Sequence, residues 1–166
     1  MRNIVLAGFM GTGKTCVGKK LAGRLGIEFV DLDDVIEARE GRLITQIFAE
    51  KGEAYFRGVE KALVREFSEK TPFVIATGGG AVVDQENLRL LKKSGVVILL
   101  EADIETILER THGQTHRPLL MVADPKGRIK ELLEARAPFY KKADYAIDTT
   151  SLNVDEVVER ILSLVS

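Results

Sequence analysis

Residues 8–15 read GFMGTGKT, and this stretch decides the fold. It fits the pattern of a phosphate-binding loop, and it follows an apolar run and opens a helix-period segment, the context that such a loop requires. Its glycines allow backbone N–H groups to turn toward phosphate oxygens, and the helix N-terminus adds a positive partial charge. The stretch therefore predicts a nucleotide-binding α/β protein. The alternative is a glycine-rich turn that binds nothing.

Two side chains in the loop have predicted roles of their own. Lys14 is suited to reach the β- and γ-phosphates, and the hydroxyl of Thr15 is suited to hold Mg²⁺. We expect Cys16 to have a small, buried, apolar side chain, and we assign its thiol no chemistry. The candidate ATP-binding residues of this segment are Gly11, Thr12, Gly13, Lys14, Thr15 and Cys16.

Composition and charge indicate an ordinary globular protein with a small partner. The chain has 166 residues, a hydrophobic fraction of 45% and a formal net charge of -1. These values suit one compact domain over residues 1–166. No long block of one charge sign indicates a nucleic-acid or membrane surface. A single cysteine cannot form a disulfide within the chain, so we expect a cytoplasmic protein.

Short apolar runs alternate with helix-period segments along the chain. The runs predicted to be strands are Asn3 to Ala7, Ile27 to Val30, Phe73 to Ala76, Val96 to Leu100 and Ala143 to Ile147. The predicted helices are Lys14 to Leu25, Asp34 to Glu40, Thr45 to Lys51, Glu53 to Glu69, Asp84 to Lys93, Asp103 to Thr111, Pro125 to Arg136 and Val154 to Val165. Because helical segments separate every pair of strands, the pattern predicts a parallel sheet. The irregular stretch at 113–124 is typical of a lid.

Two carboxylates follow the second predicted strand. In the run Asp31-Leu32-Asp33, a period of two places both acidic side chains on the same side of the chain. That side lies at the carboxyl edge of the sheet, where α/β folds bind ligands. One carboxylate is suited to hold Mg²⁺ through water, and the other to take the proton of a substrate hydroxyl. The alternative is that Asp33 or Asp34 caps the next helix, which is the preferred interpretation of Asp34.

Arg57 and Glu60 stand three residues apart and share one face of a predicted helix. An arginine there is able to clamp a carboxylate, although the pair is equally consistent with a surface ion pair. The run from Gly78 to Gly80 ends the third predicted strand. Residues without side chains let a ligand approach the backbone closely, but alone this run indicates only a turn.

Two further arginines lie late in the chain. Arg117 is in the irregular stretch, where a guanidinium on a closing lid would meet the charge of a transferring phosphoryl group. Such a lid would also exclude water and so prevent hydrolysis of ATP. Arg136, with Tyr140 near the start of the last helix-to-strand connection, is suited to complete a bidentate hold on a carboxylate. Taken alone, Arg136 would be a solvated arginine.

Together these features resemble the shikimate kinase family, over nearly the whole chain from Asn3 to Thr149. The matching motifs are the loop ending Gly13-Lys14-Thr15, the pair Asp31 and Asp33, the stretch Ile47 to Glu60, the triple glycine, Arg117-Pro118-Leu119-Leu120, and Arg136 with Tyr140. The resemblance implies an α/β/α sandwich like that of the nucleoside monophosphate kinases, with a five-stranded parallel sheet of order 2-3-1-4-5. It also implies a shikimate-binding region at about 32–60 and a lid at about 111–124.

The resemblance further implies a monomer that transfers the γ-phosphoryl group of ATP to the 3-hydroxyl of shikimate with Mg²⁺. The implied shikimate contacts are Asp33, Arg57, Gly79, Gly80 and Arg136, supported by Glu60 and Gly78. The two arginines would hold the carboxylate and Asp33 the hydroxyls.

The remaining implied roles concern the nucleotide. Lys14 and Arg117 would neutralise the phosphoryl group, so that Lys14, Asp33 and Arg117 are the catalytic candidates. Thr15 would hold Mg²⁺, with Asp31 acting through water. Arg110 would flank the adenine together with residues 149–154.

Two other interpretations stay open. A gluconate-type kinase or a nucleoside monophosphate kinase would share the loop, but neither accounts jointly for the Asp31–Asp33 pair, Arg57, the triple glycine and Arg136. A regulatory relative that binds nucleotide without turnover belongs to a different class of protein. The presence of Lys14, Asp33 and Arg117 argues against that class.

Overall fold

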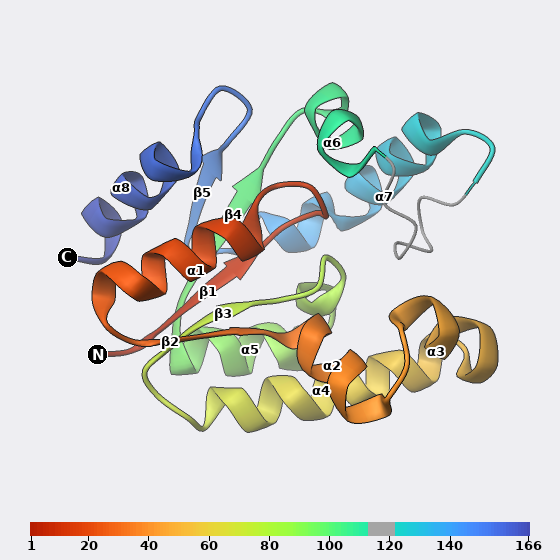
Figure 1. The fold of residues 1–166 in the computed structure, drawn as a ribbon, viewed down its shortest axis with the longest axis horizontal. Coiled ribbons are helices and arrows are strands. Elements are labelled where there is room, and N and C mark those ends of the chain that lie inside the picture. Colours follow the sequence, from red (N-terminus) through yellow and green to blue (C-terminus); the bar gives the residue numbers. More distant parts are fainter. Residues whose placement is uncertain (113–121) are drawn as a thin grey trace.

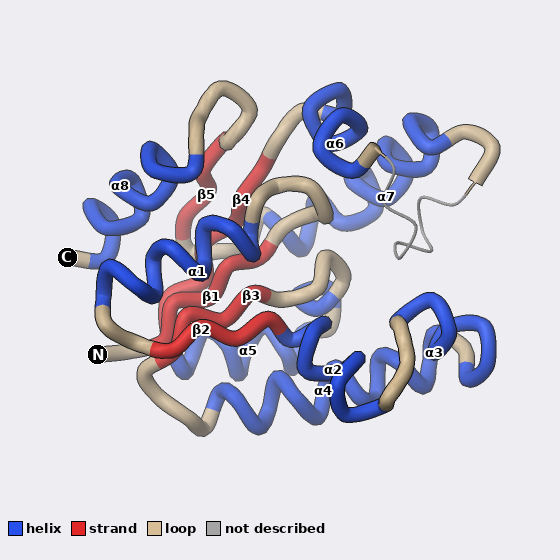
Figure 2. The backbone as a smooth tube through the Cα atoms, in the orientation of Figure 1, coloured by secondary structure: helices blue, strands red, loops and turns tan. Residues whose placement is uncertain are grey.

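The computed structural model describes residues 1–112 and 122–166. Its centre is a five-stranded parallel sheet of order β2-β3-β1-β4-β5 (Figures 1 and 2). The strands are β1 (Asn3–Ala7), β2 (Glu28–Asp31), β3 (Phe73–Ala76), β4 (Gly95–Glu101) and β5 (Tyr145–Asp148). The predicted α/β class and strand order are confirmed.

Helices cover both faces of the sheet (Figure 1). They are α1 (Lys14–Leu25), α2 (Leu32–Glu40), α3 (Ile44–Lys51), α4 (Glu53–Ser68), α5 (Gln85–Ser94), α6 (Ile104–Thr111), α7 (Pro125–Tyr140) and α8 (Val154–Val165), with a short 3-10 helix η1 at Ala81–Val83. Among the described residues, no helix combines the length and apolar character needed to cross a membrane.

The alternation of side chains along β1 explains the three layers, because successive strand residues point to opposite faces. Ile4 and Leu6 pack with α1 and α8 in one buried cluster. Val5 and Ala7 pack with α4, α5 and Tyr140 of α7 in another. Each face of the sheet therefore buries an apolar core, as expected for a parallel sheet.

The register of the sheet brings the ends of three strands together. Leu6 of β1 pairs with Ala76 of β3, and Ala76 pairs with Asp31 of β2. The loop after β1, the start of α2 and the turn after β3 therefore leave the sheet at one edge. This is the carboxyl edge, where ligands bind in open parallel sheets.

The extended backbone predicted for the run Asp31-Leu32-Asp33 is wrong. Helix α2 begins at Leu32, so Asp33 lies in its first turn and not in an extended run. Asp31 is the N-cap: its Oδ1 accepts hydrogen bonds from the N–H groups of Asp33 and Asp34, at 3.0 and 3.4 Å. Asp34 is therefore not the cap. Capping by Asp31 satisfies N–H groups that the first turn leaves without helical partners.

The end of α7 also differs from the prediction. The predicted helix ends at Arg136, yet the observed helix continues through Pro138 to Tyr140. The buried position of Tyr140 accounts for the extension, because tertiary packing outweighs local propensity. Strand β5 then begins at Tyr145, after Asp144, whose Oδ2 accepts a 2.8 Å hydrogen bond from the N–H of Val97.

Candidate active site

The loop between β1 and α1 has the backbone of a phosphate cradle. Gly8, Gly11 and Gly13 have φ angles of 137°, 79° and 94°. L-residues rarely adopt these angles, so glycine is needed for conformation at each position. The ammonium group of Lys14 donates to the carbonyls of Gly8 and Phe9, the latter at 3.2 Å. The lysine therefore lies against the loop that would carry the phosphates.

The residues predicted to hold Mg²⁺ are in direct contact. The hydroxyl of Thr15 donates to Oδ2 of Asp31 at 2.8 Å, which links α1 to the end of β2. Hydroxyl and carboxylate oxygens are hard ligands of the kind that Mg²⁺ prefers. In phosphoryl-transfer sites this ion takes few protein ligands besides the nucleotide phosphates and water. The pair therefore fits the predicted ion.

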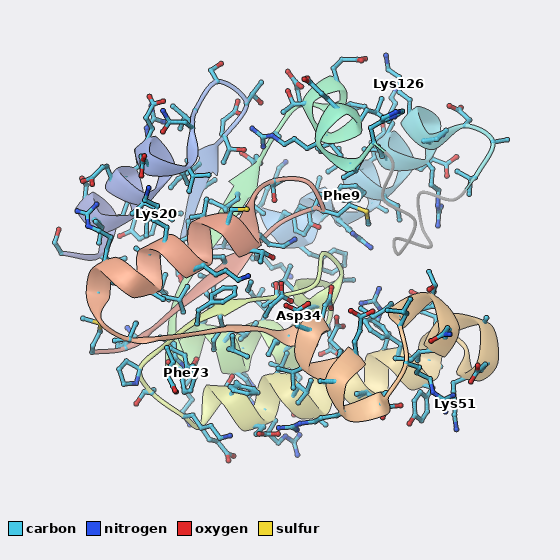
Figure 3. The ribbon with its side chains drawn as sticks, in the orientation of Figure 1. Phe9, Lys20, Asp34, Lys51, Phe73 and Lys126 are labelled. Carbon is cyan, nitrogen blue, oxygen red and sulfur yellow. The ribbon has the colours of Figure 1, made fainter. Side chains whose placement is uncertain are left out.

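A cavity of about 280 Å³ opens beside this loop. Part of its lining comes from elements that leave the carboxyl edge of the sheet, where Figure 3 shows Phe9 in the loop after β1 and Asp34 at the start of α2. Its lining includes these residues predicted from the sequence: Thr15, Asp31, Asp33, Arg57, Glu60, Gly78, Gly79, Gly80 and Arg136. The structure thus brings the predicted acceptor-binding and metal-binding residues to one place.

Arg57 and Glu60 form more than a surface ion pair. Glu60 is only 1% exposed, and its Oε1 accepts a hydrogen bond from Nη1 of Arg57 at 2.9 Å. Burial raises the pKa of Glu60, while the positive charges of Arg57 and Arg136 oppose that rise. Glu53 adds a weaker contact with Arg57 at 3.4 Å. The guanidinium of Arg57 is therefore held from within helix α4 at the wall of the cavity.

Arg136 is a cation buried at the cavity wall. It is 7% exposed, and its guanidinium lies 5.4 Å from the centre of the Phe9 ring. Its Nη1 is buried and has no hydrogen-bond partner among the described residues. A buried N–H group of a cation without such a partner is costly, and an anionic ligand in the cavity would offset that cost.

The triple glycine is explained by space and not by backbone conformation. None of these glycines has a positive φ. A Cβ built on each would instead come within 3.0 Å of a charged side chain: Gly78 of Oδ1 of Asp33 (2.9 Å), Gly79 of Nη1 of Arg136 (2.8 Å) and Gly80 of Nη2 of Arg57 (2.6 Å). The turn therefore gives the three charged groups the room to converge.

Arg110 lies outside this cavity, on the nucleotide side. Its guanidinium donates to the carbonyl of Gly11 at 3.2 Å, and to the hydroxyl and carbonyl of Thr149, both at 3.0 Å. It thus ties α6 to the phosphate loop and to the loop after β5. The predicted adenine contact of Arg110 would lie beside that second loop.

Cys16 is exposed, so the expectation of a buried side chain is wrong. Its place in the first turn of α1 explains the exposure.

The prediction for Arg117 lies outside the described residues, as does most of the predicted lid at 111–124.

The prediction from the sequence also missed part of the cavity lining. Met10, Glu37, Ile44, Phe48 and Phe56 contribute to the wall. For Met10, its position inside the phosphate loop could have indicated that it lines the cavity. The other residues lie on helices, and only tertiary packing determines which side of each helix faces the cavity.

A phosphate-binding loop beside a small cavity with two guanidinium groups and a carboxylate defines a P-loop kinase of small molecules. The chain belongs to the shikimate kinase family, because the model of that family matches residues 10–166. A shikimate kinase of Thermodesulfovibrio yellowstonii is 51% identical over 162 residues, 98% of this chain and 94% of the relative. One from Caldanaerobacter subterraneus is 50% identical, over 98% of this chain and 95% of the relative.

Solved structures agree with this assignment. A shikimate kinase from Acinetobacter baumannii, in complex with shikimate, has a TM-score of 0.96 at 40% identity and covers 99% of this chain, which in turn spans 93% of that structure. A gluconokinase from Sinorhizobium meliloti has a TM-score of 0.61 at 19% identity, over 98% of this chain and 90% of its own. The second likeness concerns the fold alone.

Proposed function

We propose that this protein transfers the γ-phosphoryl group of ATP to the 3-hydroxyl of shikimate. The observation that carries the proposal is the cavity beside the phosphate loop, in which Arg57, Arg136 and Asp33 converge on the triple-glycine turn. Shikimate has one carboxylate and three hydroxyls on a compact ring. Two guanidinium groups suit the carboxylate, and an aspartate suits the hydroxyls.

In this mechanism the acceptor is fixed before any proton moves. Arg57 and Arg136 hold the carboxylate from helices α4 and α7, so the ring has one orientation in the cavity. Asp33, in the first turn of α2, accepts the hydrogen bond of the 3-hydroxyl and takes its proton as the hydroxyl attacks. Holding both reactants in register accounts for much of the rate gain in such reactions.

The donor side neutralises charge. Backbone N–H groups of the loop and the ammonium group of Lys14 hold the phosphates and stabilise the negative charge of the transferring group. Thr15, with Asp31 through water, would hold Mg²⁺, which supplies further positive charge to the phosphate oxygens when bound. Arg117 would add its charge from the lid.

The test is shikimate-dependent release of ADP from Mg·ATP by the purified protein, with gluconate and AMP as competing acceptors. Asp33→Asn is the matched variant, because it keeps the shape of the side chain and removes the base. We expect turnover with shikimate alone and a loss of about 10²-fold or more in the variant. Turnover with gluconate or AMP would overturn the substrate assignment. ATP binding without turnover would instead favour a regulatory protein.

A further inference from the structure

Tyr140 makes a contact to the triple-glycine turn that the proposed mechanism does not use. Its hydroxyl donates a 2.5 Å hydrogen bond to the carbonyl oxygen of Gly79. Tyr140 lies one turn after Arg136 on α7 and is only 7% exposed. The space that a Cβ of Gly79 would take is filled by Nη1 of Arg136. Two residues of one helix therefore lie beside the same glycine, and Tyr140 holds its carbonyl.

The hydroxyl keeps its proton at neutral pH. Burial raises the pKa of Tyr140, while the positive charges of Arg136 and Arg57 and a hydrogen bond with the Arg136 side chain only partly oppose that rise. A protonated phenol is a hydrogen-bond donor, and here the acceptor is a backbone carbonyl. The contact is therefore a constant feature of the folded protein across the physiological pH range.

Fixing the Gly79 carbonyl also fixes the next N–H group. The peptide bond between Gly79 and Gly80 is trans, so its C=O and N–H point in opposite directions. With the carbonyl directed at α7, the N–H of Gly80 is directed away from α7. Among the described residues, this N–H donates to no backbone carbonyl. Gly80 lines the cavity, and a Cβ built on it would lie 2.6 Å from Nη2 of Arg57, so this residue stands beside that guanidinium.

We propose that Tyr140 is a positioning residue for the acceptor: by holding the Gly79 carbonyl, it aims the N–H of Gly80 at the carboxylate that Arg57 binds. This inference rests on the proposed function. A ring that served only to pack the core would leave the orientation of this peptide unspecified. The hydroxyl specifies it, at the one peptide unit that joins the contact point of Arg136 to that of Arg57.

The kinetic test is Tyr140→Phe, which keeps the buried ring and removes the donor. Loss of one positioned hydrogen bond predicts a rise of about 3- to 10-fold in the KM and Kd for shikimate. We expect kcat within about twofold, an unchanged KM for ATP, and a melting temperature only a few degrees lower, because one buried hydrogen bond is lost. Tyr145→Phe, at an exposed position on β5, is the matched control and should change none of these values. An unchanged Kd for shikimate in Tyr140→Phe would overturn the proposal.

A second measurement begins with the wild-type protein. In the wild-type protein, the backbone amide resonance of Gly80 should shift on titration with shikimate, more than that of the neighbouring Ala81. The shift should be smaller in Tyr140→Phe at saturating shikimate. A Gly80 amide that does not respond in the wild type would overturn the role of Tyr140 even if shikimate is phosphorylated. Absence of shikimate binding or turnover in the wild type would instead refute the proposed function.

Discussion

Two glycine-rich segments flank the active site, and they contain glycine for different reasons. In the loop at 8–13, Gly8, Gly11 and Gly13 have positive φ angles, so the backbone itself requires them. In the turn at 78–80 no glycine has a positive φ, and the limit is the space that charged side chains already fill. Glycine on the donor side thus permits a backbone conformation, and glycine on the acceptor side leaves room for charged side chains. Glycine in a sequence does not distinguish these cases.

The largest effect is expected on the donor side. Lys14→Ala removes the one side-chain cation that contacts the phosphate loop from α1, so it should lower kcat by about 10²- to 10³-fold, the usual cost of losing a positioned electrostatic group. The KM for shikimate should stay within a few-fold, because the acceptor cavity is unchanged. Steady-state kinetics measures both values. Lys19→Ala, an exposed position on the same helix, is the control. A main effect on shikimate KM would contradict the division of roles.

A pair of glycine variants tests the comparison directly. Gly13→Ala places a side chain at φ 94° with only Val17 nearby, so it should cost about 1–2 kcal/mol of folding stability through backbone strain. Gly80→Ala has an ordinary φ of -97° but displaces the guanidinium of Arg57. It should raise the KM for shikimate by about 10-fold with a smaller loss of stability. Thermal unfolding of the free proteins and kinetics would separate the two. Equal stability losses would refute the distinction.

The smallest effect is expected on folding stability, from the ion pairs of Glu66, one of which joins helices α2 and α4 on the acceptor side. Glu66 of α4 accepts hydrogen bonds from Arg39 of α2 at 2.7 and 2.9 Å, and one from Lys70 at 2.9 Å. These two cations lower the pKa of Glu66 from 4.5 to about 2. A lowered pKa stabilises the folded state above the unfolded value near 4.5, and this contribution is lost as pH falls toward 2.

Because the group is partly exposed, Glu66→Gln should cost less than about 1 kcal/mol at pH 7. Urea unfolding of wild type and variant between pH 7 and pH 2 checks this, and the difference should shrink as pH falls. A constant difference over that range would show that the contribution is not ionic.

The sequence was most informative where one contiguous segment makes the site. The loop at 8–15 carries its glycines, lysine and threonine in a fixed order, and the strand and helix around it follow from short-range patterns. The acceptor cavity is assembled from separate elements, and the sequence named its residues mainly through family resemblance. It misjudged the local geometry of Asp33, because strand and helix patterns overlap at Asp31-Leu32-Asp33 and the cap decides between them.

Other features depended on packing that no local pattern contains. The extension of α7 past Pro138 is explained by the burial of Tyr140 and its bond to Gly79, a residue 61 positions away in the sequence. The charged side chains that lie next to the three glycines of the turn come from three different helices. Only the folded chain shows which side chain fills which space.

The ring of Phe9 has a consequence for inhibition. Phe9 belongs to the phosphate loop, yet it supports Arg136 on the acceptor side. An inhibitor that competes with ATP and also displaces this ring would disturb Arg136 without entering the acceptor cavity. Its inhibition would be competitive toward ATP and mixed toward shikimate. An ATP analogue that leaves the ring in place would lack the second component.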